Sequence, residues 1–184
     1  MKRLNEIIVL FLLSMSITTY SEELCTVNLK DTENALVNPG MGWTMHYYSN
    51  LVSNYGSKLA PNDTLDDFPG LSTVYLRVPW AFLEPEEGQY NWALLDTPAQ
   101  RWISKGKRIA LRLTTSENWM RFATPEWVKN AGAKGTFYEY GKGRLAEGPS
   151  WDPFFDDPVY LEKLGNFLAA AAARYDGNPS VNFM

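Results

Sequence analysis

The sequence is poor in the residues that build disulfides and metal sites. It contains one cysteine, Cys25, and one histidine, His46, in 184 residues. A single cysteine excludes an internal disulfide, and a lone histidine without cysteine or histidine partners does not form a zinc site of the usual kind. We therefore expect neither a structural metal nor a cofactor.

Clusters of basic charge and long apolar stretches are also absent. The formal net charge is −4, and no run of lysine and arginine is present to neutralise phosphates, so nucleic acid is not an expected partner. The apolar run Ile7–Leu13 is too short to span a bilayer, which takes about 20 residues. A basic start, this run and the small residues up to Ser21 are together typical of a secretory signal peptide.

We therefore predict a signal peptide at residues 1–21 and a mature chain that is secreted or periplasmic, with no membrane association once the signal is removed. A buried N-terminal helix is the alternative for the same residues. Aromatic residues are abundant instead, at 14% of the chain with seven tryptophans. Aromatic side chains fill cores, but several of these lie in turns rich in glycine and proline, which favours a binding surface.

Four short apolar segments alternate with helix-like segments, and no internal repeat is evident. Composition predicts strands in the last three of these segments, and more weakly in the first. The four segments are Asn38–Trp43, Ser72–Trp80, Lys107–Thr115 and Ser180–Met184.

Two helices are predicted between these strands. In residues 94–106, Asp96 is the expected N-cap and Pro98 lies in the first turn. A longer helix begins at Pro158 after the N-cap Asp157, and its apolar residues recur at helical spacing. Its expected apolar face consists of Val159, Leu161, Leu164, Phe167, Leu168, Ala171 and Ala172.

Strands that alternate with helices, and that read as apolar on both faces, indicate a parallel sheet with helical crossovers. Closed eightfold, this gives a barrel of about 250 residues. The predicted fold class is α/β, the N-terminal half of a (β/α)8 TIM barrel truncated at the start of the fourth strand. A lead-in at 22–37 would precede the partial barrel at 38–184. An open doubly wound sheet is the alternative, although no glycine-rich phosphate turn follows the strands.

Three segments carry a family resemblance. They are RVPWAFLEPEEGQYNW, ALRLTTSENWMRFATPEWV and WDPFFDDPVYLEKLGNFLAAAAARYDGNP. In this order they resemble the β-galactosidase-like and cellulase-like glycoside hydrolases of the retaining (β/α)8 clan, over roughly residues 38–184. The resemblance implies a carbohydrate substrate, a poly- or oligosaccharide, whose O-glycosidic bonds are cleaved by two carboxylates with retention.

The resemblance also implies where the two catalytic glutamates lie. In that clan the acid/base residue ends strand four and the nucleophile ends strand seven. Both positions are then expected beyond Met184, and no catalytic residue is expected within the chain, which would be an N-terminal fragment. A non-catalytic carbohydrate-binding barrel is the alternative.

The glutamates of the stretch WAFLEPEEGQYNW are not expected to be that pair. Retaining catalysis requires two carboxyl groups about 5–5.5 Å apart on rigid elements. Glu84, Glu86 and Glu87 share one short turn and would not face a partner across a cleft. We expect Glu84 to fix the loop with a structural hydrogen bond, with direct contact to a sugar as the alternative. Glu86 and Glu87 are expected to be solvated.

Two arginines near strand ends are candidate substrate-binding residues, because barrel enzymes place their sites at the carboxyl ends of strands. The resemblance gives Arg77 the role of keeping the nucleophile ionised, and an internal salt bridge is the alternative. Arg112, on the next strand, would contact the ligand or pair with an acidic side chain on a neighbouring strand.

The remaining candidates are aromatic. Trp43, Trp80 and Trp119 are expected to follow strands one, two and three, where each would stack on a sugar ring or else be buried. His46 would bond a hydroxyl group or be a satisfied loop residue. The segment 132–151 has no strand or helix pattern and is expected to form a cleft wall with Phe137, Tyr138 and Tyr140.

Overall fold

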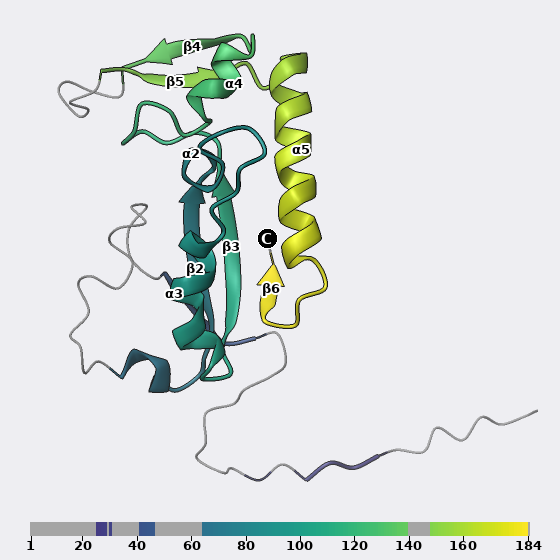
Figure 1. Cartoon of the computed structure of the whole chain (residues 1–184). Coiled ribbons are helices and arrows are strands. Elements are labelled where there is room, and N and C mark those ends of the chain that lie inside the picture. Colours follow the sequence, from purple (N-terminus) through teal and green to yellow (C-terminus); the bar gives the residue numbers. More distant parts are fainter. Residues whose placement is uncertain (1–24, 29, 31–40, 47–63, 140–147, 184) are drawn as a thin grey trace, which may run out of the picture. The chain divides into compact units, whose positions relative to one another are not determined.

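The computed structural model describes residues 25–28, 30, 41–46, 64–139 and 148–183 (Figure 1). The chain divides into two units, residues 1–34 and 35–184. The first has no helix or strand in its described residues, and the predicted signal peptide lies outside them. All helices and strands below belong to the second unit.

A parallel four-stranded sheet forms the centre of the second unit. Its strands are ordered β1 (Trp43–His46), β2 (Leu71–Pro79), β3 (Arg108–Thr114) and β6 (Val181–Phe183). Strands two to four were therefore predicted correctly to within a few residues. Strand one was displaced, since it begins rather than ends at Trp43. The parallel order with helical crossovers is that of part of a (β/α)8 barrel.

The two faces of the sheet differ, which corrects the expectation of strands apolar on both faces. On one face, Val74, Leu76 and Val78 of β2 lie beside Ile109 and Leu111 of β3 in the hydrophobic core. Alternate side chains point to the opposite face, which we call the polar face. Register and alternation assign to it His46, Thr73, Tyr75, Arg77, Arg108, Arg112 and Thr114.

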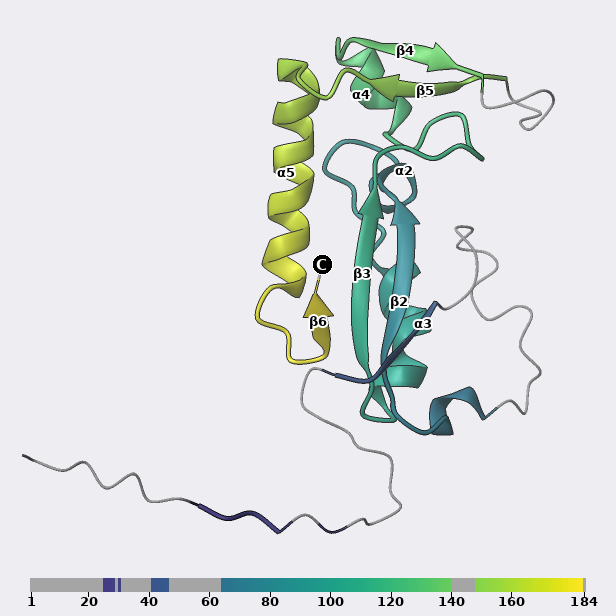
Figure 2. The same ribbon diagram turned by 180° about the vertical axis from the view of Figure 1, so that it is seen from behind.

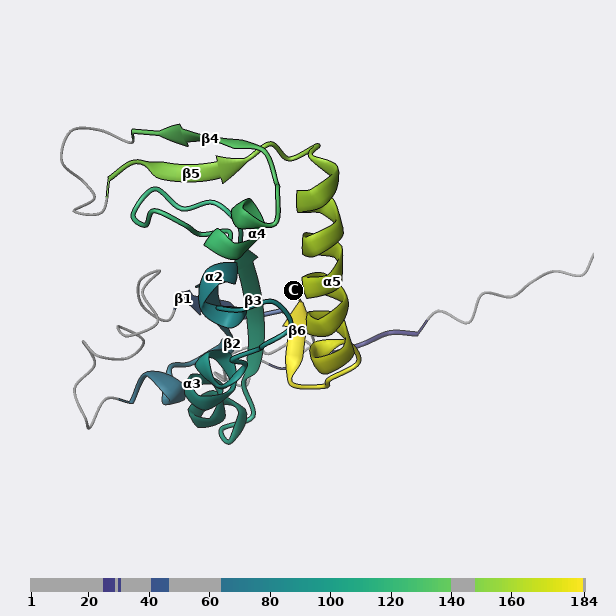
Figure 3. The same cartoon turned by 45° about the horizontal axis from the view of Figure 1, so that its top comes forward.

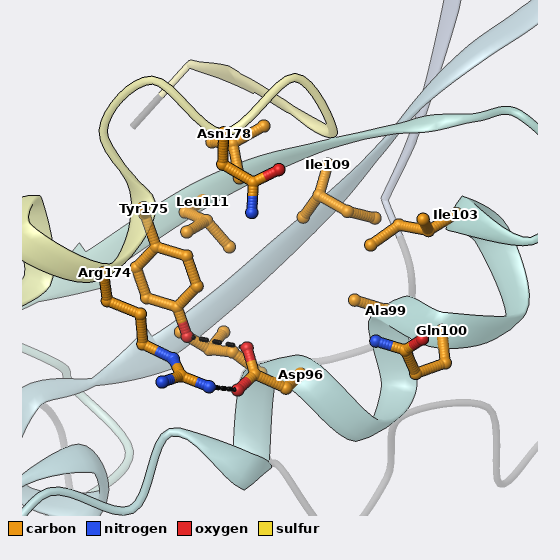
Figure 4. Close-up of a pocket in the computed structure, with 11 residues that line it drawn as sticks. Asp96, Ala99, Gln100, Ile103, Ile109, Leu111, Arg174, Tyr175 and Asn178 are labelled. Atoms are coloured by element: carbon orange, nitrogen blue, oxygen red, sulfur yellow. Dashed lines mark hydrogen bonds and ion pairs between the residues drawn. The ribbon is translucent and has the colours of Figure 1, made fainter.

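Helix α3 (Ala93–Ile103) covers the apolar face between β2 and β3 and contributes Leu95, Ala99 and Trp102 to the core. Its N-cap is Trp92, so the prediction that Asp96 caps the helix is wrong. Asp96 lies in the first turn and accepts hydrogen bonds from Arg174 and from the Tyr175 hydroxyl (Figure 4). These bonds join α3 to the end of the next long helix beside a cavity of about 390 Å³.

That helix, α5 (Pro158–Tyr175), begins as predicted. The Asp157 carboxylate accepts hydrogen bonds from the backbone N–H groups of Val159 and Tyr160, both at 3.0 Å. Figures 1 and 2 show α5 running alongside β3 and β6. Its buried face includes Phe167 and Ala171, whereas Leu161 and Leu168 are exposed, so the predicted apolar face was too wide.

The segment 132–151 is not patternless. An antiparallel hairpin pairs β4 (Gly135–Tyr138) with β5 (Ser150–Pro153) and follows the short helix α4 (Glu126–Asn130). A Cβ atom on Gly135 would lie 2.4 Å from the Asp152 carbonyl oxygen, which explains glycine there. Figure 3 brings this hairpin forward, at the end of the sheet to which β2 and β3 point. Residue 140 lies outside the described ranges.

Candidate functional site

The carboxyl ends of β2 and β3 carry an ion pair between Arg77 and Glu117. Arg77 Nε donates to Glu117 Oε1 at 2.8 Å, and Arg77 Nη2 pairs with Glu117 Oε2. The side chain of Glu117 is 1% exposed and that of Arg77 is 22% exposed. Two parallel bonds of this kind fix both position and orientation of a guanidinium.

Glu117 holds two further side chains. Thr114, the last residue of β3, donates its hydroxyl proton to Oε1 at 2.7 Å. The indole Nε1 of Trp119 donates to Oε2 at 2.9 Å. Each carboxylate oxygen therefore accepts two hydrogen bonds, and Glu117 organises the site rather than offering a free carboxylate to a substrate.

Trp119 is half-buried at this site. Its ring lies 6.3 Å from the ring of Phe82, in the short helix α2 (Trp80–Leu83) that follows β2. An aromatic side chain that keeps one part exposed while its N–H is bonded suits contact with the apolar face of a sugar. The structure thus brings the predicted residues Arg77 and Trp119 together.

Trp80 does not offer such a surface. It is fully buried, and its ring stacks on Phe167 of α5 with centroids 5.1 Å apart. Its Nε1 donates to Glu84 Oε2 at 2.7 Å. The hypothesis that Trp80 stacks on a sugar is therefore wrong, because no face of the indole reaches solvent.

Glu84 is the centre of a second network that fixes the turn after α2. Its Oε1 accepts the backbone N–H of Gly88 at 2.7 Å, and its carbonyl accepts Trp127 Nε1 at 3.0 Å. Burial and then the nearby charge of Glu84 raise the pKa of Tyr90. Glu84 thus has the structural role expected of it, and Glu86 and Glu87 are exposed as expected.

Two more of the predicted residues lie on the polar face, Arg112 opposite Arg77 on the neighbouring strand and His46 on β1. Arg112 is exposed, and its Nη1 lies 3.3 Å from the Tyr75 hydroxyl. His46 is the last residue of β1, and its ring lies 5.1 Å from that of Tyr75. Both therefore face the same side of the sheet as Arg77.

Comparison with known proteins identifies the family. Residues 35–184 match the model of glycoside hydrolase family 42, described as beta-galactosidase. The chain belongs to this family. No curated protein matches it. This glycoside hydrolase domain is of the (β/α)8 clan, in agreement with the parallel sheet and its helical crossovers.

Trp43 lies away from the Arg77–Glu117 pair in the glycoside hydrolase domain. It begins β1 and pairs with Leu71, the first residue of β2, so it occupies the amino end of the sheet. Its side chain is 67% exposed. The expectation that Trp43 follows strand one failed because that strand starts at this residue.

The β4–β5 hairpin adds aromatic side chains near the carboxyl ends of β2 and β3. Phe137 is half-exposed and lies 6.4 Å from Phe122, measured between ring centroids. The guanidinium of Arg121 lies 5.6 Å from the Phe137 ring and 5.5 Å from the Phe122 ring. Tyr138, the next strand residue, is also exposed and points to the other side of the hairpin.

The described ranges were also searched for metal and membrane features. Within them, no group of three or more His, Cys, Asp or Glu side chains is arranged to hold a metal ion. None of their helices is long and apolar enough to cross a membrane.

Sequence reasoning missed Glu117, the central residue of the site. Its sequence signal is weak, since it is one polar residue in a loop that follows a strand. The distinguishing fact is its pairing with Arg77, forty residues earlier. That pairing depends on the register of β2 and β3, which sets Arg77 opposite Arg112 and Pro79 opposite Thr114.

Proposed function

We propose that this chain forms part of a retaining glycoside hydrolase that cleaves a β-galactoside or a related oligosaccharide. The observation that carries the proposal is the cluster of Arg77, Glu117 and Trp119 at the carboxyl ends of two parallel strands. That is the end at which barrel enzymes of this architecture bind their substrates. The family match supports the same chemistry.

In this proposal the cluster orients the sugar and does not perform acid–base catalysis. Both oxygens of Glu117 are occupied, and those of Glu84 are bonded to Trp80 and Gly88. We place the two catalytic carboxylates outside the described residues, as the clan resemblance implies. Arg77, fixed by Glu117, would then lie close to the nucleophile or the sugar.

The test is hydrolysis of an aryl β-galactoside by the full-length protein, with the anomeric configuration of the first product read by NMR. We expect retention, and a loss of kcat in Arg77→Gln. Arg101→Gln is the matched control, because Arg101 also forms an ion pair, with Asp66 at 2.9 Å, remote from this end of the sheet. Inversion, or equal activity in Arg77→Gln, would contradict the proposal.

We also propose that the protein is exported, on the pattern of residues 1–21. The mature N-terminus would follow Ser21, and mass spectrometry of the protein from the culture medium or periplasm checks this. Retention of the complete N-terminus in the cytoplasm would contradict it.

A further inference from the structure

The turn that carries Trp119 is held at both of its ends by one side chain of the β4–β5 hairpin. Ser150 is the first residue of β5 and is 1% exposed. Its hydroxyl oxygen lies 2.9 Å from the Met120 carbonyl oxygen and 3.4 Å from that of Glu117. Asn118 and Trp119 form the turn between these two residues. A hydroxyl has one proton to donate, so the shorter contact is the hydrogen bond and the longer one is a weaker second contact.

The next residue of β5 continues this attachment. The backbone N–H of Trp151 donates to the Arg121 carbonyl at 2.7 Å. The Trp151 side chain is buried, and its ring lies 6.2 Å from that of Phe122, measured between centroids. Two consecutive residues of the hairpin therefore hold the loop over residues 117–122.

Other hydrogen bonds close this loop at its base. Thr124 Oγ1 donates to the Thr115 carbonyl at 2.8 Å, and the backbone N–H of Ala81 donates to the Ala123 carbonyl at 2.9 Å. These bonds remain when Ser150 loses its hydroxyl group, because they do not involve it. Loss of that hydroxyl should therefore release the turn and leave the rest of the loop in place.

The turn matters for the site because Glu117 precedes it and Trp119 lies in it. The Glu117 carboxylate binds Arg77, and the Trp119 indole donates to the same carboxylate at 2.9 Å. A shift of the turn backbone therefore moves the points from which the Glu117 and Trp119 side chains start. A misplacement of about 1 Å in a group that positions a substrate can cost far more than the bond that fixed it.

We propose that Ser150 is a positioning residue for the sugar and acts through the turn that carries Trp119. Its hydroxyl holds the Met120 carbonyl and thereby sets where the Trp119 ring lies. The β4–β5 hairpin is in this way part of the site, although Ser150 itself touches no sugar. This inference rests on the proposed function, in which the cluster of Arg77, Glu117 and Trp119 orients the sugar.

Ser150→Ala in the full-length protein tests the proposal by two readouts, the kinetics of aryl β-galactoside hydrolysis and the NMR signal of the Trp119 indole N–H. We expect the signal to shift and KM to rise about fivefold, the effect of one neutral hydrogen bond. The value of kcat should stay nearly constant, because a rise in KM alone marks lost binding. A merely structural role would instead reduce the folded fraction, which lowers the apparent kcat and leaves KM.

Thr124→Val is the matched control. It also removes a buried hydroxyl group that donates to a backbone carbonyl of this loop, and it should change neither KM nor the Trp119 signal. Ser150→Thr gives a second measurement, since the hydroxyl is retained, and both readouts should stay near their wild-type values.

Three results would overturn the proposal. One is a Trp119 signal that does not move in Ser150→Ala, and another is an unchanged KM in that variant. The third is a KM raised equally in Thr124→Val or in Ser150→Thr, because the effect would then not belong to the Ser150 hydroxyl.

The outcome for Ser150 is separable from that for the proposed function. Hydrolysis with retention, together with an unchanged KM in Ser150→Ala, would overturn the positioning role and leave the glycosidase. If the wild-type protein hydrolyses no glycoside, the catalytic proposal is contradicted, and calorimetric titration with galactose replaces KM. A shifted Trp119 signal with weaker galactose binding in Ser150→Ala would then support the positioning role, and equal galactose affinity would overturn it.

Discussion

The clusters around Glu84 and Glu117 share one element, a buried glutamate that accepts the indole N–H of a tryptophan. The two bonds are 2.7 Å for Trp80–Glu84 and 2.9 Å for Trp119–Glu117. Glu84 takes its side-chain and backbone donors from Trp80 and Gly88, four residues away on either side. Glu117 instead draws Arg77 from a different strand.

The Glu84 carboxylate thus stabilises one turn of the chain, whereas the Glu117 carboxylate connects two strands. In the Glu84 cluster, Trp80 is fully buried and packs against Phe167 of α5. The Glu117 cluster joins the ends of β2 and β3 and leaves its tryptophan and its arginine partly exposed. We therefore expect damage to the first cluster to appear in stability, and damage to the second to appear in binding as well.

The largest contrast should come from the tryptophans. Trp80→Ala should lower the free energy of unfolding by about 4 kcal/mol, because it empties a fully buried site. Trp119→Ala should cost far less stability, since that side chain is half-exposed, but should weaken sugar binding about tenfold. Denaturant unfolding and sugar titration measure the two effects. If Trp119→Ala were as destabilising as Trp80→Ala, the distinction between a structural cluster at Glu84 and a binding cluster at Glu117 would be contradicted.

Substitutions of the two glutamates should differ more in their effect on sugar binding than in their effect on stability. Glu84→Gln and Glu117→Gln should each cost about 2 kcal/mol of unfolding free energy, because each loses charge-assisted hydrogen bonds in a buried place. Only Glu117→Gln should weaken sugar binding, since it releases Arg77 and Trp119.

The indole N–H resonances provide the control for this pair. Glu117→Gln should shift the signal of Trp119 and leave that of Trp80, and Glu84→Gln should do the reverse. Assignment follows from Trp119→Phe. Unaltered sugar affinity in Glu117→Gln, despite a shifted Trp119 signal, would show that its positioning role is unimportant.

The same contrast explains which features could be predicted from the sequence. The helix at Pro158–Tyr175 and the strands around Val74 and Ile109 follow from local patterns, a proline at the first helical position and runs of β-branched residues. The structural role of the Glu84 side chain is also local, because the partners of its carboxylate are four residues distant. These features were predicted nearly in place.

Features that depend on distant partners were not predicted. Glu117 acquires its role through Arg77, and which side chains of β2 and β3 lie opposite one another depends on the register of the two strands. The β4–β5 hairpin was missed because its sequence is rich in glycine and aromatic residues without alternating apolar positions. Trp43 was misplaced because a four-residue strand gives little pattern from which to locate its ends.

A smaller effect is expected from the hydroxyl groups near β3. Thr114→Val removes the donor to Glu117 Oε1 at nearly constant volume and should cost about 1 kcal/mol. Thr124→Val is the matched control, since Thr124 is also buried and donates to the Thr115 carbonyl at 2.8 Å. Both should lower the unfolding free energy similarly, and only Thr114→Val should shift the Trp119 indole signal. A shift of equal size in Thr124→Val would indicate general loosening of the loop.

The smallest effect should be a loss of stability at alkaline pH that involves Tyr90 and Glu84 but not Glu117. Burial, then the charge of Glu84, raises the pKa of Tyr90 above its ordinary value near 10. The unfolded chain therefore loses this proton first as the pH rises, so the unfolding free energy contributed by Tyr90 is complete below pH 10 and declines above it.

Tyr90→Phe should make the decline above this pH shallower, as measured by urea unfolding across the alkaline range. Buried Tyr160 and Tyr175 also have raised pKa values, so part of the decline should remain in the variant. In the protein that keeps Tyr90, Glu84→Gln should remove the part of the Tyr90 contribution that comes from the charge of Glu84, whereas Glu117→Gln should leave that contribution unchanged. An equal change of the alkaline decline in both glutamine variants would mean that the Glu84 and Glu117 clusters are electrostatically coupled and do not act independently.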